Sequence, residues 1–383
     1  MRGALCTFAA SITWIAAAPA LAWHWPGEDA VEPAIRGVTV GPIESSQQPG
    51  RGYGTPYTEE LLDELARLGT NAISITPFGR IWDLQSTEIL MDFEAPYEDN
   101  RAAVARMITQ AKARGMHVLL VPHLWVETSG WRGEIDPGSE EGWLAYQASY
   151  RHFVLSWARD AARFGADAFS IGVECKSWSG AHGQYWTDLI SETRKVFKGP
   201  LTYSSNWDEV EGVIFWDQLD WLGINAFYPL ADRSGADYGT YARSAREALA
   251  GAGTIAADLE MPILLVEIGY TTRADAAVEP WLWPDGMSEV TVDEWEQARA
   301  LHAIAAAAAE RSDVVGFFVW RYYANLDDVS QEAIWGFSPH GKLAEQVLSA
   351  IFRSRWGADP RTPTWFPLAL SPRDHFAETF VMP

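Results

Sequence analysis

The chain has little cysteine and lacks the signature motifs of several common enzyme classes. It contains two cysteines in 383 residues, and because Cys6 falls in a segment that we expect to be removed, no intramolecular disulfide is predicted. No glycine-rich phosphate motif follows the first predicted strand, which disfavours a dinucleotide-binding sheet. No G-x-S-x-G motif of a Ser-His-Asp hydrolase occurs either. The eight histidines show no close ligand spacing, so no metal and no cofactor are predicted.

The remaining cysteine, Cys175, stands next to Glu174 in the sequence. A catalytic thiol needs a base such as histidine close to it, and none adjoins this position. A small buried apolar side chain is the favoured interpretation.

Charge is strongly of one sign. The formal net charge is −22, but the acidic residues are scattered and form no long block. This disfavours nucleic acid and anionic membranes as partners, and it is typical of a solvated acidic surface on an exported protein. The length and the 48% hydrophobic content are sufficient for one large domain with a substantial core.

The N-terminus has the pattern of a secretory signal. Met1 and Arg2 are followed by an apolar stretch from Ala4 to Ala18, and Ala20-Leu21-Ala22 supplies small residues around a cleavage point. We therefore predict a signal peptide over residues 1–22 and a secreted or periplasmic mature chain. The apolar stretch is short for a membrane span, so the mature chain is expected to have no span and to be a monomer.

One pattern recurs along the rest of the chain: an amphipathic helix, a glycine and then an apolar strand. Leu61, Leu65 and Leu68 follow helical spacing before Gly69, and an alternating strand begins at Asn71. Glycine ends such helices because it adopts a left-handed conformation without strain. The same unit recurs further along the chain, ending in Gly115 and Gly165. Helices that alternate with strands indicate a parallel sheet.

Counting the strands favours a single (β/α)₈ TIM barrel over residues 23–356. A C-terminal extension over residues 357–383 is rich in proline. The eight predicted strands are Ile35–Val40, Asn71–Ile75, His117–Val121, Ala168–Val173, Leu201–Ser204, Trp221–Ala226, Pro262–Val266 and Val315–Trp320.

Two glutamates, Glu174 and Glu267, each end an apolar run that is predicted to be a buried strand. A buried carboxylate is costly unless it is used, and all barrel strands end at one face. The two side chains can therefore converge. A retaining glycosidase needs two carboxyl groups about 5–5.5 Å apart. The alternative is that each glutamate forms a local ion pair with Lys176, Arg273 or Arg321.

Tryptophan is unusually frequent, with 20 residues, and several tryptophans lie just after predicted strands. Some of them must pack in the core. Others could stack on the apolar faces of sugar rings at the mouth of a cleft, because an indole offers a large flat surface and one N–H donor. The strand-end tryptophans are Trp82, Trp125, Trp178, Trp207 and Trp320.

Four segments, in order and at the expected strands, carry a resemblance to a known family. They are P-H-L-W-V-E-T-S-G-W-R-G-E-I, I-G-V-E, I-N-A-F-Y-P-L and L-L-V-E-I-G-Y. The chain resembles the glycoside hydrolases of clan A, and more specifically family 113, whose characterised members are β-mannanases. The resemblance covers residues 36–353. It implies that Glu174 is the acid/base and Glu267 the nucleophile, which we expect to stay ionised.

One position departs from the clan. Clan A enzymes commonly carry Asn directly before the acid/base, whereas this chain has Val173. Such an asparagine bonds the sugar 2-hydroxyl, so that contact must come from elsewhere. Asn206 and Asn225, after the fifth strand and at the sixth, are the candidates.

Other candidate site residues follow from their positions. Tyr228 resembles the clan's aromatic hydroxyl that orients the nucleophile, although a rim tyrosine without a role is the alternative. His123 either bonds a sugar hydroxyl or is structural. Arg132 either meets a sugar hydroxyl or orders its loop with Glu134 or Asp136. The aromatic candidates for substrate binding are Trp125, Trp131, Trp178, Trp207, Tyr270 and Trp320, with Trp320 as the floor of the subsite next to the scissile bond.

These observations predict a retaining glycoside hydrolase that cleaves β-linked glycans by double displacement, with β-1,4-mannan or glucomannan as the first substrate to test. Two alternatives remain. One is a non-catalytic glycan-binding barrel, and the other is an exopolysaccharide-processing hydrolase with a different β-glycan substrate. The choice of sugar epimer and of endo or exo action stays open.

Overall fold

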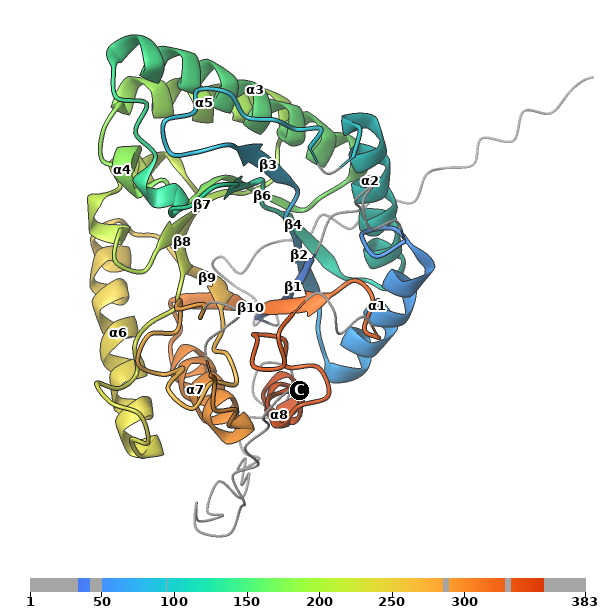
Figure 1. Cartoon of the computed structure of the whole chain (residues 1–383), viewed down its shortest axis with the longest axis vertical. Helices are drawn as coiled ribbons and strands as arrows, with labels where there is room; N and C mark the ends of the chain where they lie inside the picture. Colours follow the sequence, from blue (N-terminus) through green and yellow to red (C-terminus); the bar gives the residue numbers. More distant parts are fainter. Residues whose placement is uncertain (1–33, 42–49, 94, 285–288, 328–331, 355–383) are drawn as a thin grey trace, which may run out of the picture. The chain divides into compact units, whose positions relative to one another are not determined.

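The computed structural model describes residues 34–41, 50–93, 95–284, 289–327 and 332–354 (Figure 1). The predicted signal peptide (residues 1–22) and the proline-rich extension (residues 357–383) lie outside these ranges. All described residues fall in one compact unit, residues 33–383. Within them, no helix is long and apolar enough to cross a membrane.

Eight parallel strands close into a barrel in the order β1-β10-β9-β8-β7-β6-β4-β2 (Figure 1). This confirms the predicted (β/α)₈ fold. Some neighbouring strands pair without any shift of register. Between β7 and β8, for example, the pairing runs unbroken from the pair Thr202 and Trp221 to the pair Asn206 and Asn225. The barrel strands are β1 (Ile35–Gly41), β2 (Ala72–Ile75), β4 (His117–Leu120), β6 (Ala168–Val173), β7 (Leu201–Asn206), β8 (Trp221–Asn225), β9 (Ile263–Ile268) and β10 (Val314–Tyr323).

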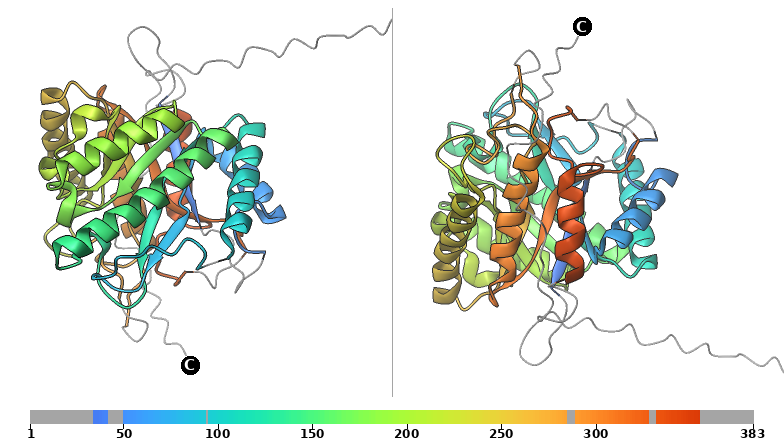
Figure 2. Two further views of the ribbon diagram at one scale, coloured as in Figure 1. Left: turned by 90° about the horizontal axis from the view of Figure 1, so that it is seen from above. Right: turned by 90° about the horizontal axis from the view of Figure 1, so that it is seen from below.

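Helices surround the barrel on its outside (Figures 1 and 2). Helix α1 ends at Gly69 with φ 100°, and α3 ends at Gly165 with φ 85°. These left-handed residues confirm two of the three predicted glycine caps. In the third unit the cap is Arg114, with φ −99°, and Gly115 follows it with φ 72°. The long helices are α1 (Pro56–Leu68), α2 (Tyr97–Ala113), α3 (Glu140–Phe164), α5 (Gly183–Val196), α6 (Tyr238–Asp258), α7 (Glu294–Ala309) and α8 (Leu343–Ser354), and α4 (Lys176–Ser179) is a single turn.

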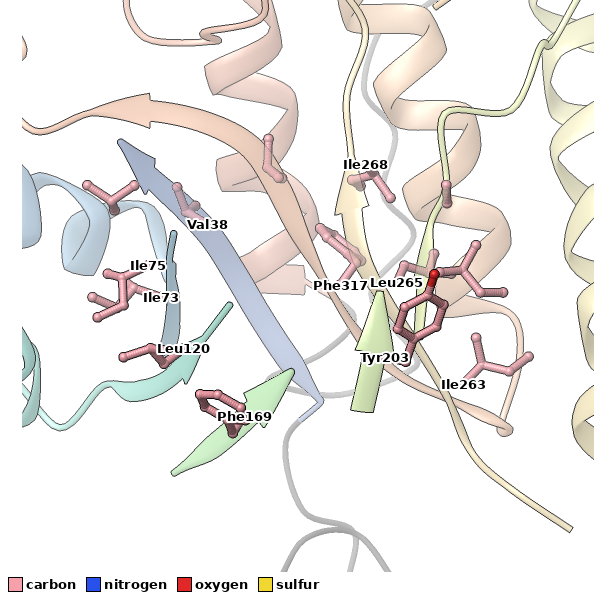
Figure 3. Packing of buried hydrophobic residues seen from close by; sticks show 14 of the residues in the cluster. Val38, Ile73, Ile75, Leu120, Phe169, Tyr203, Ile263, Leu265, Ile268 and Phe317 are labelled. Atoms are coloured by element: carbon pink, nitrogen blue, oxygen red, sulfur yellow. The ribbon is translucent and has the colours of Figure 1, made fainter. Parts of the chain in front are cut away.

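The core is built from the barrel strands together with the inward faces of the surrounding helices. Strands that are covered on both faces need no polar alternation, and β6 and β9 are buried throughout. Each fully buried aliphatic or aromatic side chain contributes about 1.5–3 kcal/mol. Figure 3 shows part of this packing, in which the labelled residues are Val38, Ile73, Ile75, Leu120, Phe169, Tyr203, Ile263, Leu265, Ile268 and Phe317.

A second, two-stranded parallel sheet was not predicted. It consists of β3 (Phe78–Ile81) and β5 (His123–Val126), which follow β2 and β4 after short breaks. Each break contains a proline, Pro77 and Pro122, whose nitrogen cannot donate to a ladder. The barrel pairing therefore stops, and the chain resumes with the His123 N–H bonded to the Pro77 carbonyl at 3.0 Å.

The tight contact between β7 and β8 generates a test of this packing. A Cβ at Gly223 of β8 would lie 2.4 Å from the Tyr203 carbonyl oxygen and 2.3 Å from the Thr202 hydroxyl. We expect Gly223→Ala to lower the free energy of unfolding by about 1–3 kcal/mol. Urea unfolding measures this change.

Gly251→Ala is the matched control. A Cβ at Gly251, inside α6, would meet no atom within 4 Å, and alanine is favoured over glycine in a helix by about 0.5–1 kcal/mol. Equal stability changes in both variants would contradict the packing argument.

Candidate active site

Glu174 directly follows β6 and adopts a backbone conformation that is unusual for a side-chain-bearing residue. Its φ is 50°, in the left-handed region, where a non-glycine residue costs on the order of 1–3 kcal/mol and is often functional. The neighbouring strand β7 holds this turn, because the Glu174 N–H donates to the Ser204 carbonyl at 2.8 Å. The side chain is 6% exposed.

Three donors surround the Glu174 carboxylate. The Trp131 indole N–H donates to Oε2 at 2.8 Å, and the Asn225 amide donates to Oε1 at 3.0 Å. The Arg132 guanidinium also binds Oε2 and forms an ion pair with it. All three contacts stabilise a charged carboxylate.

Arg132 links this carboxylate to the second sheet. Its Nε donates to the Leu124 carbonyl of β5 at 2.8 Å. The residue lies in the 3-10 turn η1 (Arg132–Glu134), which thereby becomes fixed to both β5 and Glu174. The sequence suggested a sugar hydroxyl, Glu134 or Asp136 as the partner of Arg132. In the structure its guanidinium forms an ion pair with Glu174 instead.

Glu267, on β9, has a different environment. Its side chain is 5% exposed, and Oε1 has no hydrogen-bond partner within the part of the chain that the structure describes. Burial raises the pKa of Glu267 well above its usual range, and the negative charge of Glu174 raises it further. The charges of Arg132 and Arg321 offset this only in part. This shift opposes the expectation that Glu267 stays ionised in the substrate-free protein.

His123 is the nearest basic group to Glu267. Its Nε2 lies 4.0 Å from Glu267 Oε1, which is too long for a hydrogen bond. The ring is buried between Phe78, at 4.9 Å, and Trp320, at 6.1 Å between centroids. Burial lowers the pKa of His123 well below its usual range, so the imidazole is neutral at physiological pH.

The two candidate asparagines, Asn225 and Asn206, differ in burial and in their hydrogen-bond partners. Asn225, at the end of β8, is fully buried and contacts Glu174, as described above, and its Oδ1 has no partner among the described residues. Asn206 is engaged in its own turn, where its amide donates to Asp208 at 2.9 Å and its carbonyl accepts the Trp207 N–H at 3.0 Å. Asn225 is therefore the amide at the site.

Two predicted substrate contacts lie in the core instead. Trp178 is fully buried and stacks on Trp186 at 4.3 Å, so no face of its indole is available to a sugar. Tyr270 is also buried, and its hydroxyl donates to the Tyr228 carbonyl at 2.9 Å. Strand-end position alone does not reveal this burial.

Tyr228 does not make its predicted contact in the substrate-free protein. None of the hydrogen bonds of the described residues joins its hydroxyl to Glu267. Burial raises the pKa of Tyr228, and its ring lies 5.8 Å from Trp207. Trp207 in turn stacks on Trp281, at 5.6 Å and an interplanar angle of 25°. Trp281 was not predicted, since it follows no strand directly, yet it is 48% exposed and covers Trp207.

The second sheet carries a row of aromatic side chains. Trp125 is 48% exposed, and its ring meets Phe78 edge-on at 6.2 Å. The Arg80 guanidinium lies over Trp125 at 5.5 Å and over Phe93 at 5.4 Å. We call the rings of Phe78, Phe93 and Trp125, together with the Arg80 guanidinium that contacts all three, the aromatic row. It leads from the His123 ring out to the surface. The sequence predicted Trp125 alone, because β3 and its pairing were not anticipated.

Two buried carboxyl groups at the carboxyl ends of barrel strands, beside half-buried Trp320 and exposed aromatic rings, define the class of protein. This is the arrangement of a glycoside hydrolase. Within the described part of the chain, no three His, Cys, Asp or Glu side chains gather as metal ligands.

Comparison with known proteins gives the family. A profile of Glycoside Hydrolase Family 113 matches residues 46–342. The chain belongs to this family and is a glycoside hydrolase. Among curated proteins, no relative matches the chain.

Solved structures share the fold. The family 113 β-mannanase AaManA from Alicyclobacillus acidocaldarius, in complex with ManMIm, has a TM-score of 0.72 and 25% identity, covering 84% of this chain and 97% of that chain. A family 113 β-1,4-mannanase complex has a TM-score of 0.71 and 24% identity over 85% of this chain and 100% of that chain. A family 5 mannosidase from Rhizomucor miehei has a TM-score of 0.55 and 13% identity, covering 83% and 92%.

The environment of Glu267 predicts a pH-dependent cost to stability. Because the pKa of Glu267 is raised on folding, the folded state binds its proton more tightly than the unfolded chain does, and stability is lost as pH rises above about 4.3. Glu267→Gln removes this loss. We expect the variant to exceed the parent in free energy of unfolding by at least about 1 kcal/mol at pH 7, and the gain should shrink as the pH falls.

Urea unfolding between pH 4 and pH 8 measures this difference. Glu247→Gln, at an exposed position of α6, is the control and should leave stability nearly unchanged at every pH. A constant difference between Glu267→Gln and the parent across the series would refute the explanation by burial.

Proposed function

We propose that this glycoside hydrolase retains anomeric configuration and cleaves β-linked glycans, with β-1,4-mannan or glucomannan as the substrate. The observation that carries the proposal is the pair Glu174 and Glu267, which lie at the ends of β6 and β9, close enough for the charge of one to raise the pKa of the other. The names of the two family 113 neighbours, both β-mannanases, support the choice of substrate.

Glu267 is the nucleophile in this proposal, and Glu174 is the acid/base. Glu267 attacks the anomeric carbon while Glu174 protonates the departing glycosidic oxygen, which gives a covalent glycosyl-enzyme. Glu174 then takes a proton from water, whose oxygen attacks the same carbon and releases Glu267. Two inversions leave the configuration unchanged. The strand positions of the two residues match the order of roles in clan A.

The hydrogen bonds of the free protein favour the opposite division of charge. Three donors stabilise ionised Glu174, whereas Glu267 Oε1 has none within the described residues. A sugar hydroxyl beside Glu267 would supply the missing donor and favour its ionised form. One proton would then pass from Glu267 to Glu174, directly or through the substrate. We propose that substrate binding sets the reactive charge state of this coupled pair.

The surroundings of the pair suit a neutral glycan. Sugar rings stack on exposed aromatic faces. Trp125 of the aromatic row is 48% exposed, and half-buried Trp320 lies 6.1 Å from the His123 ring between centroids. The net charge of −22 imposes no electrostatic penalty on an uncharged polymer. A chain of several sugars could follow the aromatic row outward from the carboxyl pair.

The roles of the two glutamates can be separated by chemical rescue. We expect Glu174→Ala and Glu267→Ala each to lower kcat on β-1,4-mannan by about 100-fold or more. Azide should restore turnover of an activated aryl β-mannoside in both variants. It should give the α-glycosyl azide with Glu267→Ala, because azide attacks the sugar directly, and the β-azide with Glu174→Ala, because it attacks the glycosyl-enzyme.

NMR of the glycosyl azide products determines their anomeric configuration. The reverse assignment of the two azides would exchange the roles of the glutamates. Full activity of either variant would overturn the catalytic proposal and favour a glycan-binding barrel. If the parent cleaves another β-glycan but not mannan or glucomannan, the mechanism stands and the substrate assignment fails.

The aromatic row predicts a dependence on substrate length. Trp125→Ala should raise KM for long manno-oligosaccharides by about 2- to 10-fold, the value of one ring contact, and should leave the kcat and KM of a short aryl β-mannoside unchanged. Leu144→Ala, which removes a 63% exposed side chain from α3, is the control. Steady-state kinetics on a length series measures the effect, and an equal loss on short and long substrates would argue against a distal sugar contact.

A further inference from the structure

A third buried carboxyl group lies near the site and has no part in the mechanism described so far. Glu209 precedes the 3-10 turn η2 (Val210–Gly212), after β7, and is 4% exposed. Its Oε1 accepts a hydrogen bond from the Tyr203 hydroxyl at 2.5 Å, and its Oε2 accepts one from the Asn206 N–H at 3.0 Å. Burial raises the pKa of Glu209 to about 7, and the charge of Glu174 also raises it.

Tyr203 connects this carboxyl group to the acid/base loop. Its ring lies on β7 and is fully buried, and its hydroxyl oxygen accepts the Cys175 N–H at 2.6 Å. A backbone N–H can only donate, so the Tyr203 hydroxyl proton is left for Glu209. The direction of the two bonds is thereby fixed, from Cys175 through Tyr203 to Glu209.

Cys175 is the residue directly after Glu174. The left-handed turn at Glu174 is held by two bonds to β7, one from the Glu174 N–H to the Ser204 carbonyl and one from the Cys175 N–H to Tyr203. A strained backbone conformation persists only where its surroundings over-determine it. The second of these two bonds depends on a side chain, and the orientation of that side chain's hydroxyl depends on Glu209.

We propose that Glu209 is a positioning residue for Glu174: its buried carboxylate orients the Tyr203 hydroxyl, which holds the Cys175 N–H and so fixes the turn that aims Glu174 at the glycosidic oxygen. This inference rests on the proposed role of Glu174 as acid/base. It makes Tyr203 and Glu209 part of one unit, although neither touches the substrate.

The chemistry of the position explains why a carboxylate occupies it. Glu209 accepts hydrogen bonds from the Tyr203 hydroxyl and from the Asn206 N–H. A glutamine could accept from Tyr203 through its one oxygen, but its NH₂ group would then face the Asn206 N–H, which is also a donor. Only an acidic side chain has an acceptor at both places.

The dependence of the rate on the leaving group distinguishes a residue that positions the catalytic acid from one whose loss damages the whole active site. Protonation of the leaving oxygen matters for an unactivated oligosaccharide and matters little for a dinitrophenyl glycoside, whose leaving group departs as a stable anion. We expect Glu209→Gln and Tyr203→Phe each to lower kcat about 10-fold on mannopentaose. On dinitrophenyl β-mannobioside the glycosylation rate, measured by the burst, should change less than 2-fold, and KM for mannopentaose should stay the same.

The two variants should also be non-additive, since they break one chain of bonds. The double variant should lose no more than the worse single variant. Matched controls come from a second buried pair, in which the Tyr241 hydroxyl donates to Glu296 at 2.7 Å between α6 and α7. Tyr241→Phe and Glu296→Gln should leave both substrates unaffected. Should one site variant fail to fold, the other carries the test, because both disturb the same chain of hydrogen bonds.

Equal losses on the two substrates, additive losses, or no loss on either would overturn the positioning role. Glu174→Gln on the same substrates tests the proposed function separately. If Glu174→Gln shows the leaving-group dependence and the Glu209 and Tyr203 variants do not, the positioning inference fails and the proposed function stands. If Glu174→Gln shows no such dependence, the acid/base role itself fails.

Discussion

The ion pair between Arg132 and Glu174 is the interaction on which the site depends. It neutralises one of two carboxyl groups that share a buried space, and without it two acidic side chains would face each other with little compensation. Removing one partner of such a buried pair typically costs about 3–5 kcal/mol. The same guanidinium is bonded to the Leu124 carbonyl, so neutralising Glu174 also fixes the second sheet against the barrel. Charge compensation and the attachment of the second sheet thus depend on one side chain.

The negative charges of the two carboxyl groups are not compensated equally. Glu174 receives three donors, whereas Glu267 has an oxygen without a partner among the described residues, next to a neutral histidine. The protein therefore keeps one carboxyl group in an environment that is costly for its charged form. A group that is under-solvated in the free protein gains most from a ligand that brings a donor. In the proposed mechanism, this oxygen of Glu267 is the position where a sugar hydroxyl completes the site, at the expense of stability without substrate.

Much of this was readable in the sequence. The glycines after α1 and α3 and the apolar runs β6 and β9 predicted the barrel, and the barrel order then placed Glu174 and Glu267 on one face. Side-chain direction beyond a strand end was not readable. Trp125 and Trp178 both follow barrel strands, yet Trp125 lies exposed on β5 and Trp178 lies in the core within α4. The pKa of Glu267 likewise depends on burial and on charged groups from distant parts of the chain. Pro77 and Pro122 were the unused signal for the second sheet.

The barrel fixes each glutamate through the strand beside it. The Glu174 N–H bonds to Ser204 of β7, and the Glu267 carbonyl accepts the Ala226 N–H just after β8, at 2.6 Å. Double displacement demands a constant separation of the two carboxyl groups, and backbone pairing in a closed sheet is the stiffest support that a protein offers for it. The aromatic row and Trp281 lie outside this framework, on β3, β5 and the loops after β3 and β9. Under the proposed function, changes there would alter which glycan binds without moving the carboxyl pair, and substrate choice and bond cleavage would rest on separate parts of one fold.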